Sequence, residues 1–167
     1  MNDLRNGIID INGFLLTPTT TLEELENHFG IQGEVDDCFS EFNLGGQLFI
    51  NNGMQFKLEI VYDNEAPNKV WYVKLTPVIP ELIKKYDVSE HNCPRDYYND
   101  LLPYYRDVRA VLDKWLYEQL GEPHENDDHG VGYKFNNILI FTSAYHNKRN
   151  PHDNFDIIGG SLEIHYR

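Results

Sequence analysis

The chain has 167 residues, 41% of them hydrophobic and 13% aromatic, and its 27 acidic against 14 basic residues give a formal net charge of −13. This composition is too aromatic for a disordered chain, and the length fits one domain, residues 1–167, that can fold without disulfides or metals. The negative charge repels phosphate backbones and anionic lipids, so we expect no nucleic-acid binding and no membrane binding, whereas a cationic protein partner is favoured.

The N-terminal region predicts a β-hairpin followed by a short helix. Apolar runs flank Asn12-Gly13, and this dipeptide is a strong signal for a two-residue turn. The helix is expected to begin at Thr20 or Thr21, because each has a Glu three positions later and can form a capping box. Gly30 is expected to end the helix.

The same region carries a long run of uncompensated negative charge. Between Arg5 and Lys57 the chain has eight acidic residues and no Lys or Arg. Acids in the first turn of the short helix suit the helix dipole and have a local explanation. The four that lie beyond this helix lack one, and they are the candidate partner-binding carboxylates: Glu34, Asp36, Asp37 and Glu41. A cluster of this kind would steer a cationic partner towards it.

The middle of the chain predicts an antiparallel β-meander. Between Cys38 and Thr76 the hydrophobic period is two, which is typical of strands with one face on a core and one facing water. In one strand four apolar residues alternate with polar ones: Phe56, Leu58, Ile60 and Tyr62. In the next strand three residues are expected on one face: Trp71, Val73 and Leu75.

A short helical turn is expected at 80–86, followed by a long helix that covers a sheet. The long helix has an apolar stripe spaced by threes and fours: Tyr98, Leu101, Tyr105, Val108, Leu112 and Trp115. Pro103 lies inside this pattern and must kink the helix or mark its start. Three tyrosines off the stripe are candidate exposed anchors for a partner: Tyr97, Tyr104 and Tyr117.

The C-terminal part predicts strands joined by polar segments. HENDDH, residues 124–129, is expected to be a loop, residues 132–135 and 137–144 strands, and 146–154 a long turn before a last strand that ends at Tyr166. The whole pattern predicts an α+β fold with a single antiparallel β-sheet, made of the meander and terminal hairpins, packed against one long and one short α-helix.

The sequence contains no catalytic signature, and we expect no enzyme activity, no cofactor and no metal site. HENDDH is not an HExxH motif, because residue 128 is Asp, and Cys38 lies among acids that oppose thiolate formation. Two alternatives stay open: a small-molecule or peptide-binding domain with its ligand between sheet and helix, and a hydrolase that uses the His-rich loops. The hydrolase requires three of the following side chains to converge on a metal: His124, Asp127, His129, His146 and His152.

The compartment is expected to be cytoplasmic. The first residues, MNDLRNGIIDINGFLL, lack the parts of a signal peptide, and no run approaches the roughly 18 apolar residues of a membrane span. Cys38 and Cys93 have no motif spacing and are interpreted as reduced thiols.

The C-terminal part resembles small bacterial immunity proteins of polymorphic and contact-dependent toxin systems. Four runs between Leu112 and Arg167 carry the resemblance: LDKWLYEQLGEP, YKF, ILIFTSAY and GGSLEIHYR. They are similar to a helix with a Trp that runs to LGxP, followed by a strand pair that ends in an IxIxY-type strand. The resemblance implies a cytoplasmic inhibitor that binds one toxin domain tightly, and it implies no particular functional residues.

Overall fold

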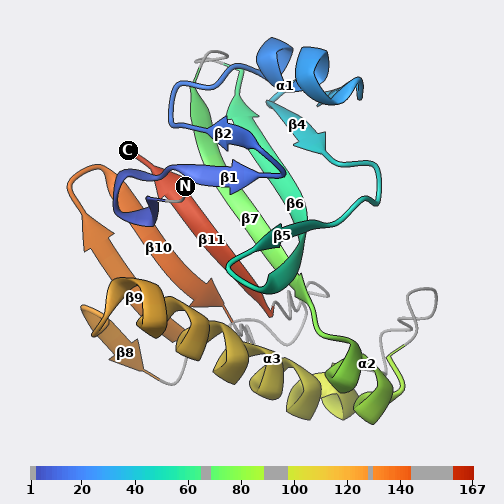
Figure 1. Ribbon diagram of the computed structural model, residues 1–167, viewed down its shortest axis with the longest axis vertical. Helices are drawn as coiled ribbons and strands as arrows, with labels where there is room; N and C mark the ends of the chain where they lie inside the picture. The colour runs from blue at the N-terminus through green and yellow to red at the C-terminus, as the bar shows by residue number, and fades with distance from the viewer. Residues whose placement is uncertain (1–2, 65–68, 89–97, 128–129, 144–159) are drawn as a thin grey trace.

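A computed structural model describes residues 3–64, 69–88, 98–127, 130–143 and 160–167 (Figure 1). Its helices are the 3-10 turn η1 (Leu4–Asn6) and the α-helices α1 (Leu22–Phe29), α2 (Pro80–Tyr86) and α3 (Tyr98–Leu120). Its strands are β1 (Ile9–Ile11), β2 (Phe14–Leu16), β3 (Glu34–Val35), β4 (Phe39–Asn43), β5 (Phe49–Asn51), β6 (Met54–Asp63), β7 (Val70–Val78), β8 (Glu125–Asp127), β9 (Gly130–Phe135), β10 (Ile138–Ser143) and β11 (Ser161–Tyr166).

The large sheet is antiparallel, with the order β3-β4-β6-β7-β11-β10-β9-β8, and β5 pairs with β6 off this path. The last strand, β11, lies in the middle of the sheet. Ile164 pairs with Val73 of β7 on one side and with Ile140 of β10 on the other. The C-terminal strand therefore joins the meander to the β9–β10 hairpin. The predicted α+β class with an antiparallel sheet is confirmed.

The prediction of a single sheet is wrong, because β1 and β2 form a separate two-stranded sheet. Their register pairs Ile9 with Leu16. Figure 1 shows this hairpin lying across one face of the large sheet. Ile9, Ile11 and Leu16 are completely buried there. Pairing along the edge of the large sheet would cover less apolar surface on these short strands, so burial favours the stacked position.

The core lies between the large sheet and a layer made of α1, α3 and the β1–β2 hairpin. Alternate residues of the central strands point into it, among them Phe56, Ile60, Leu75, Ile140 and Ile164. The long helix contributes the predicted stripe residues Val108, Leu112 and Trp115, and the Trp115 ring meets Phe56 at 5.3 Å. Each of these side chains stabilises the fold by about 1.5–3 kcal/mol through burial.

Helix α1 has the predicted ends. The Thr21 hydroxyl accepts a hydrogen bond from the Glu24 amide (3.2 Å), and the Glu24 carboxylate accepts one from the Thr21 amide (2.8 Å). Gly30 ends the helix in the left-handed conformation. The Phe29 ring lies 5.9 Å from that of Phe42 in β4. The helix therefore packs on the core side of β4, and the chain that leaves it enters the β3–β4 hairpin.

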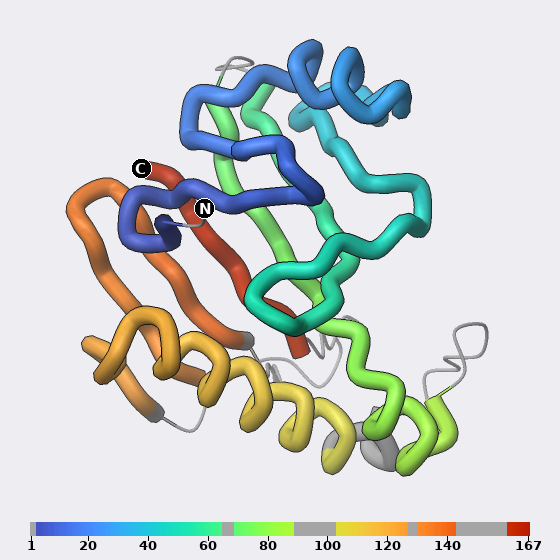
Figure 2. Tube along the Cα trace, in the orientation of Figure 1, coloured from blue at the N-terminus to red at the C-terminus, as the bar shows by residue number. Residues whose placement is uncertain are grey.

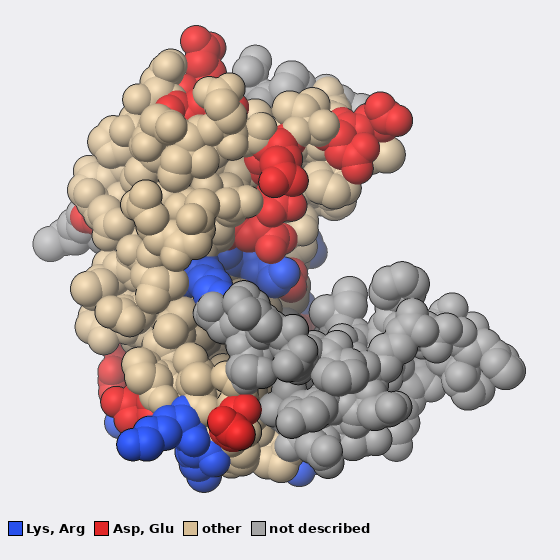
Figure 3. Space-filling view, turned by 90° about the vertical axis from the view of Figure 1, so that its right-hand side faces the viewer, with Lys and Arg blue, Asp and Glu red and all other residues tan. Residues whose placement is uncertain are grey.

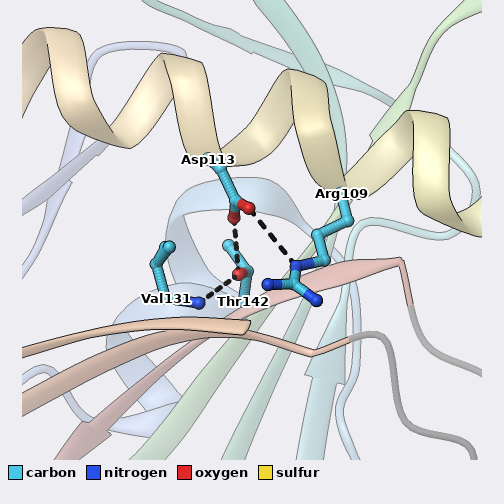
Figure 4. A network of polar contacts seen from close by, with 4 residues as sticks. All are labelled: Arg109, Asp113, Val131 and Thr142. Carbon is cyan, nitrogen blue, oxygen red and sulfur yellow. Dashed lines mark hydrogen bonds and ion pairs between the residues drawn. The ribbon is translucent and has the colours of Figure 1, made fainter. Parts of the chain in front are cut away.

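Helix α3 is held on the sheet by a polar network that spans three elements (Figure 4). The Thr142 hydroxyl of β10 donates to Asp113 Oδ1 (2.7 Å) and accepts from the Val131 amide of β9 (3.1 Å). Arg109 Nε donates to Asp113 Oδ2 at 3.3 Å. The helix begins at Tyr98, so Pro103 lies inside it and does not mark its start. Side chains 98–102 lie outside the described part of the chain.

A β-bulge turns Trp71 out of the core. Val61 pairs with Tyr72, but the next residue, Tyr62, pairs with Val70, so Trp71 is the extra residue of β7. Val70 and Val73 are completely buried, while Trp71 is 49% exposed. The prediction that Trp71 shares a face with Val73 and Leu75 is therefore wrong, because strict alternation does not survive an inserted residue.

The first described residues lie beside the C-terminal strand (Figure 2). The Tyr166 hydroxyl donates to the Gly7 carbonyl at 2.9 Å, which ties the end of β11 to the turn after η1. The HENDDH segment is not the expected loop throughout, because Glu125–Asp127 forms the edge strand β8 beside β9. Residues 128, 129 and 146–154 lie outside the described ranges.

Candidate functional site

The structure brings together the four carboxylates that the sequence singled out. Glu34 and Glu41 are direct cross-strand partners in the β3–β4 hairpin. Asp36 and Asp37 lie in the turn that connects the two strands, and both are exposed. We call residues 34–43 the acidic hairpin. The acidic hairpin follows α1 in the chain, and its strand β3 forms one edge of the large sheet.

Hydrogen bonds fix the turn of the acidic hairpin. The Asp36 amide donates to the Phe39 carbonyl (3.0 Å), and the Asp36 carboxylate accepts from the Asp37 amide (2.6 Å). The Asn64 side chain donates to the Asp36 carbonyl (2.6 Å) and accepts from the Ser40 hydroxyl (2.8 Å). The two aspartates are therefore held on an ordered turn that is bound to the end of β6.

The acidic surface continues across the sheet on the face opposite to the core, which we call the outer face. Glu59 of β6 pairs with Lys74 of β7, and Lys74 pairs in turn with Glu163 of β11. The Lys74 ammonium lies 3.2 Å from the Glu59 carboxylate. Like-charged neighbours in such rows repel one another. Lys57 of β6 lies two residues before Glu59 on the same side of the strand, so the outer face carries lysines as well as carboxylates.

The pKa of Glu41 records this crowding of negative charge. Partial burial raises the pKa of this carboxyl above its ordinary value, and the nearby Glu59 and Glu34 carboxylates raise it further. The Lys74 ammonium opposes them and lowers the pKa. Glu41 therefore belongs both to the acidic hairpin and to the carboxylates of the outer face.

Tyr72 lies in the centre of the outer face, among the carboxylates. Burial, followed by the charges of Glu59, Glu163 and Glu41, raises the pKa of its phenol to about 12. The hydroxyl therefore keeps its proton at physiological pH. It presents a hydrogen-bond donor and an apolar ring among negative groups.

Aromatic rings line up across the same face. The Trp71 and Tyr72 rings meet edge to face at 5.6 Å. Tyr72 stacks on His165 of β11 at 5.1 Å, and His165 stacks on Phe141 of β10 at 5.1 Å. His165 Nε2 also lies 2.9 Å from the Glu163 carboxylate. We call Trp71, Tyr72, His165 and Phe141 the aromatic row.

Charge is unevenly distributed over the edge of the molecule that carries β4. Figure 3 shows Asp and Glu side chains in its upper half, Lys and Arg side chains below them at the middle, and both kinds together at the lower end. Within the described ranges, no ion pair joins Glu34, Asp36 or Asp37 to a Lys or Arg. All three side chains are exposed to solvent.

Neither of the two candidate tyrosines that the structure describes belongs to this site. Tyr104 is 9% exposed and packs against Tyr86 and Tyr105, so its predicted exposure is wrong. It belongs to the contact between α2 and α3, which the stripe alone did not indicate. Tyr117 is 50% exposed, but α3 packs on the core side of the sheet, away from the outer face. Tyr97 lies outside the described residues.

The sequence did not indicate the following outer-face residues as site residues: Glu59, Glu163 and the four rings of the aromatic row. The alternation of Glu59 and Glu163 with buried neighbours predicted that they face water. It did not predict that they lie near each other. They do so because β7 lies between β6 and β11, so that Lys74 pairs with Glu59 on one side and with Glu163 on the other. No local signal marked the bulge at Trp71.

The described side chains include no group of three His, Cys, Asp or Glu that could hold a metal ion. His124 Nδ1 accepts a hydrogen bond from the Lys134 amide at 2.8 Å, which gives this histidine a structural role next to β9. The Asp127 side chain, His129, His146 and His152 are not among the described positions. The hydrolase alternative thus gains no support from the ligands that the structure describes.

Two openings border the elements of interest. A cleft of about 270 Å³ is lined by Glu41, Asn43, Lys57, Glu59 and Thr76 among others, and it adjoins the outer face. A groove of about 580 Å³ between β2 and α1 is lined mainly by threonines and other polar residues. Between the sheet and α3, Trp115 and Phe56 are in contact, so the interior position proposed for a ligand is filled at that point.

Comparisons with known proteins give no relative: no family model, no curated protein and no solved structure matches the chain. Among the described helices, none has the length and apolar character needed to cross a membrane. The α+β fold and the acidic, aromatic outer face are therefore the observations from which a function must be argued.

Proposed function

We propose that the protein is a noncatalytic binding module that docks a cationic protein partner on the acidic hairpin and the adjoining outer face. Its most specific form is a cytoplasmic immunity-type protein that inhibits a basic bacterial toxin domain. The proposal is carried by one observation: the β3–β4 pairing gathers Glu34, Asp36, Asp37 and Glu41 at one sheet edge, beside the strand that carries Glu59.

The arrangement suits electrostatic recognition. Carboxylates on an ordered turn lose little conformational freedom when a partner binds, so less of the interaction energy is lost in ordering them. Clustered charge also raises the rate of encounter with an oppositely charged protein and disfavours partners of like charge. Mutual repulsion among these carboxylates in the free protein would be relieved when a cationic surface covers them.

The toxin class follows from the resemblance of the C-terminal part and from charge. Toxins that cleave nucleic acids need basic surfaces to hold phosphates. An inhibitor with a rigid array of carboxylates can occupy such a surface in place of the phosphates. This supports a basic nuclease domain as the partner to test first.

Co-expression provides the functional test. We expect the wild-type protein to restore growth to cells that produce the toxin-like product of the neighbouring gene. The double variant Asp36→Asn/Asp37→Asn keeps an amide oxygen at position 36 for the Asp37 amide, so the turn is preserved while two charges are lost. It should protect less well, because the loss of two charges slows association with the cationic partner. In a binding experiment, the slower association should be most visible at low salt.

A matched control separates local charge from total charge. The double variant Glu118→Gln/Glu122→Gln removes two charges from the C-terminal end of α3 and the residues just beyond it, on the core side of the sheet. It should protect as well as wild type. Failure of the wild-type protein to restore growth would reject the toxin-inhibitor role, and equal loss in both double variants would reject the acidic hairpin as the docking site.

A further inference from the structure

Packing of the core does not explain the position of the aromatic row, because the row lies on the outer face of the sheet. The bulge in β7 turns Trp71 outward, next to Tyr72, and leaves half of its surface exposed. The other tryptophan, Trp115 of α3, is buried between this helix and the sheet. Exposed tryptophan is uncommon outside binding surfaces, where it often contributes a large share of the affinity. The outer face therefore contains an anchor that acidity alone does not explain.

The row also has negative groups within reach. Glu59 of β6 and Glu163 of β11 lie on the strands that flank Tyr72, each diagonally opposite to it. Glu41 of β4 pairs with Val61, the residue opposite Tyr72. Glu163 additionally contacts His165, the third ring. Aromatic faces attract cations, and the attraction grows where carboxylates supply further negative potential.

A guanidinium group fits this arrangement better than an ammonium group. It is planar and weakly hydrated, it stacks on aromatic faces, and it can bind a carboxylate with two parallel hydrogen bonds. An ammonium group is a compact, strongly hydrated charge that gains less from a flat ring. Lys74 is bound to Glu59, and Lys57 lines the neighbouring cleft with Glu41 and Glu59. The Trp71 ring remains half-exposed beside them.

We propose that the aromatic row and its carboxylates select arginine side chains of the cationic partner over lysine side chains. This inference rests on the proposed docking function and specifies what the outer face recognises. Guanidinium groups would stack on the Trp71–Tyr72 pair while Glu41, Glu59 and Glu163 neutralise their charge. The acidic hairpin would then attract the cationic partner, and the aromatic row would distinguish its arginine side chains from its lysine side chains.

Two peptides of equal length and charge test this inference directly: oligoarginine and oligolysine, titrated against the full chain by calorimetry at low salt. Oligoarginine should bind roughly three- to tenfold more tightly than oligolysine. Trp71→Leu should bring the two affinities to nearly the same value. Trp71→Phe, which keeps a ring, should retain part of the preference for arginine.

Tyr117→Leu is the matched control, because Tyr117 is exposed to the same degree as Trp71 but lies on α3. It should leave the ratio of the two affinities unchanged. Circular dichroism verifies that each variant is folded.

The outcomes separate the two proposals. If neither peptide binds, the docking function itself fails. If both bind equally to the wild-type protein, or if Trp71→Leu keeps the full preference, the arginine inference is overturned while acidic docking stands. Self-association that Trp71→Leu abolishes would show that a second copy covers the row, and would also overturn the inference.

Discussion

Individual residues of the outer face show how the site is charged, and Glu41 is the most informative. Its carboxyl is partly buried and lies near two other carboxylates, which together raise its pKa above the ordinary value of 4.5. A carboxyl with a raised pKa binds its proton more tightly in the folded state than in the unfolded state. It therefore costs stability once the pH rises through 4.5 and past the folded-state pKa.

Glu41→Gln should remove this cost. We expect the variant to be more stable than wild type at pH 7, and the gain should shrink towards zero as the pH falls below about 4. Urea unfolding at both pH values measures the difference. Glu23→Gln, on the exposed first turn of α1, is the control and should give no stabilisation at pH 7. A loss of stability in Glu41→Gln at pH 7 would contradict the crowding of carboxylates on this face.

At the scale of elements, the site depends on a sheet whose shape is held by α3. The Thr142 hydroxyl is buried and satisfies both the Val131 amide and the Asp113 carboxylate. Thr142→Val preserves the volume but leaves the buried amide without a partner, so the free energy of unfolding should fall by about 1–3 kcal/mol.

Thr142→Ser keeps the hydroxyl and should cost less than Thr142→Val in the same urea titration. A double-mutant cycle with Asp113→Ala should show coupling, because both residues belong to one network. If Thr142→Val is as stable as wild type, the network in Figure 4 does not anchor the helix.

The elements also show which parts of the structure could be predicted. Helix α1 was predictable because its start and end signals, Thr21, Glu24 and Gly30, are all local. The edge strands β3 and β8 were not, because segments of two or three residues become strands only through pairing with distant partners. Trp71 was assigned to the wrong face because a bulge depends on both strands of a pair.

At the scale of the whole molecule, the same limit applies to the site. The sequence singled out the four carboxylates of the acidic hairpin because they lie close together in the chain. It could not identify the rest of the outer face, because Glu59 of β6, Lys74 of β7 and Glu163 of β11 become neighbours only when the last strand inserts beside β7. The proposed docking surface therefore depends on the strand order.

The proposal that a cationic partner docks on one side of the protein depends on how the acidic residues are distributed over its surface. A chain with 27 acidic residues could spread them evenly, and the acidity would then serve solubility alone. Here four carboxylates occupy one hairpin and continue onto one sheet face, while α3 and the hairpin β1–β2 cover the other face. A cation should therefore bind to one side of the protein.

Chemical-shift mapping by NMR tests this most directly, with oligoarginine titrated into the isotope-labelled protein at low salt. The largest amide shift changes should fall on residues 34–43, on β6 and β7 around Glu59 and Trp71, and on β11 around Glu163. Amides at the C-terminal end of α3, beside Glu118 and Glu122, should change little although both carboxylates are exposed. Changes centred on α3, or spread evenly over all acidic residues, would contradict the account.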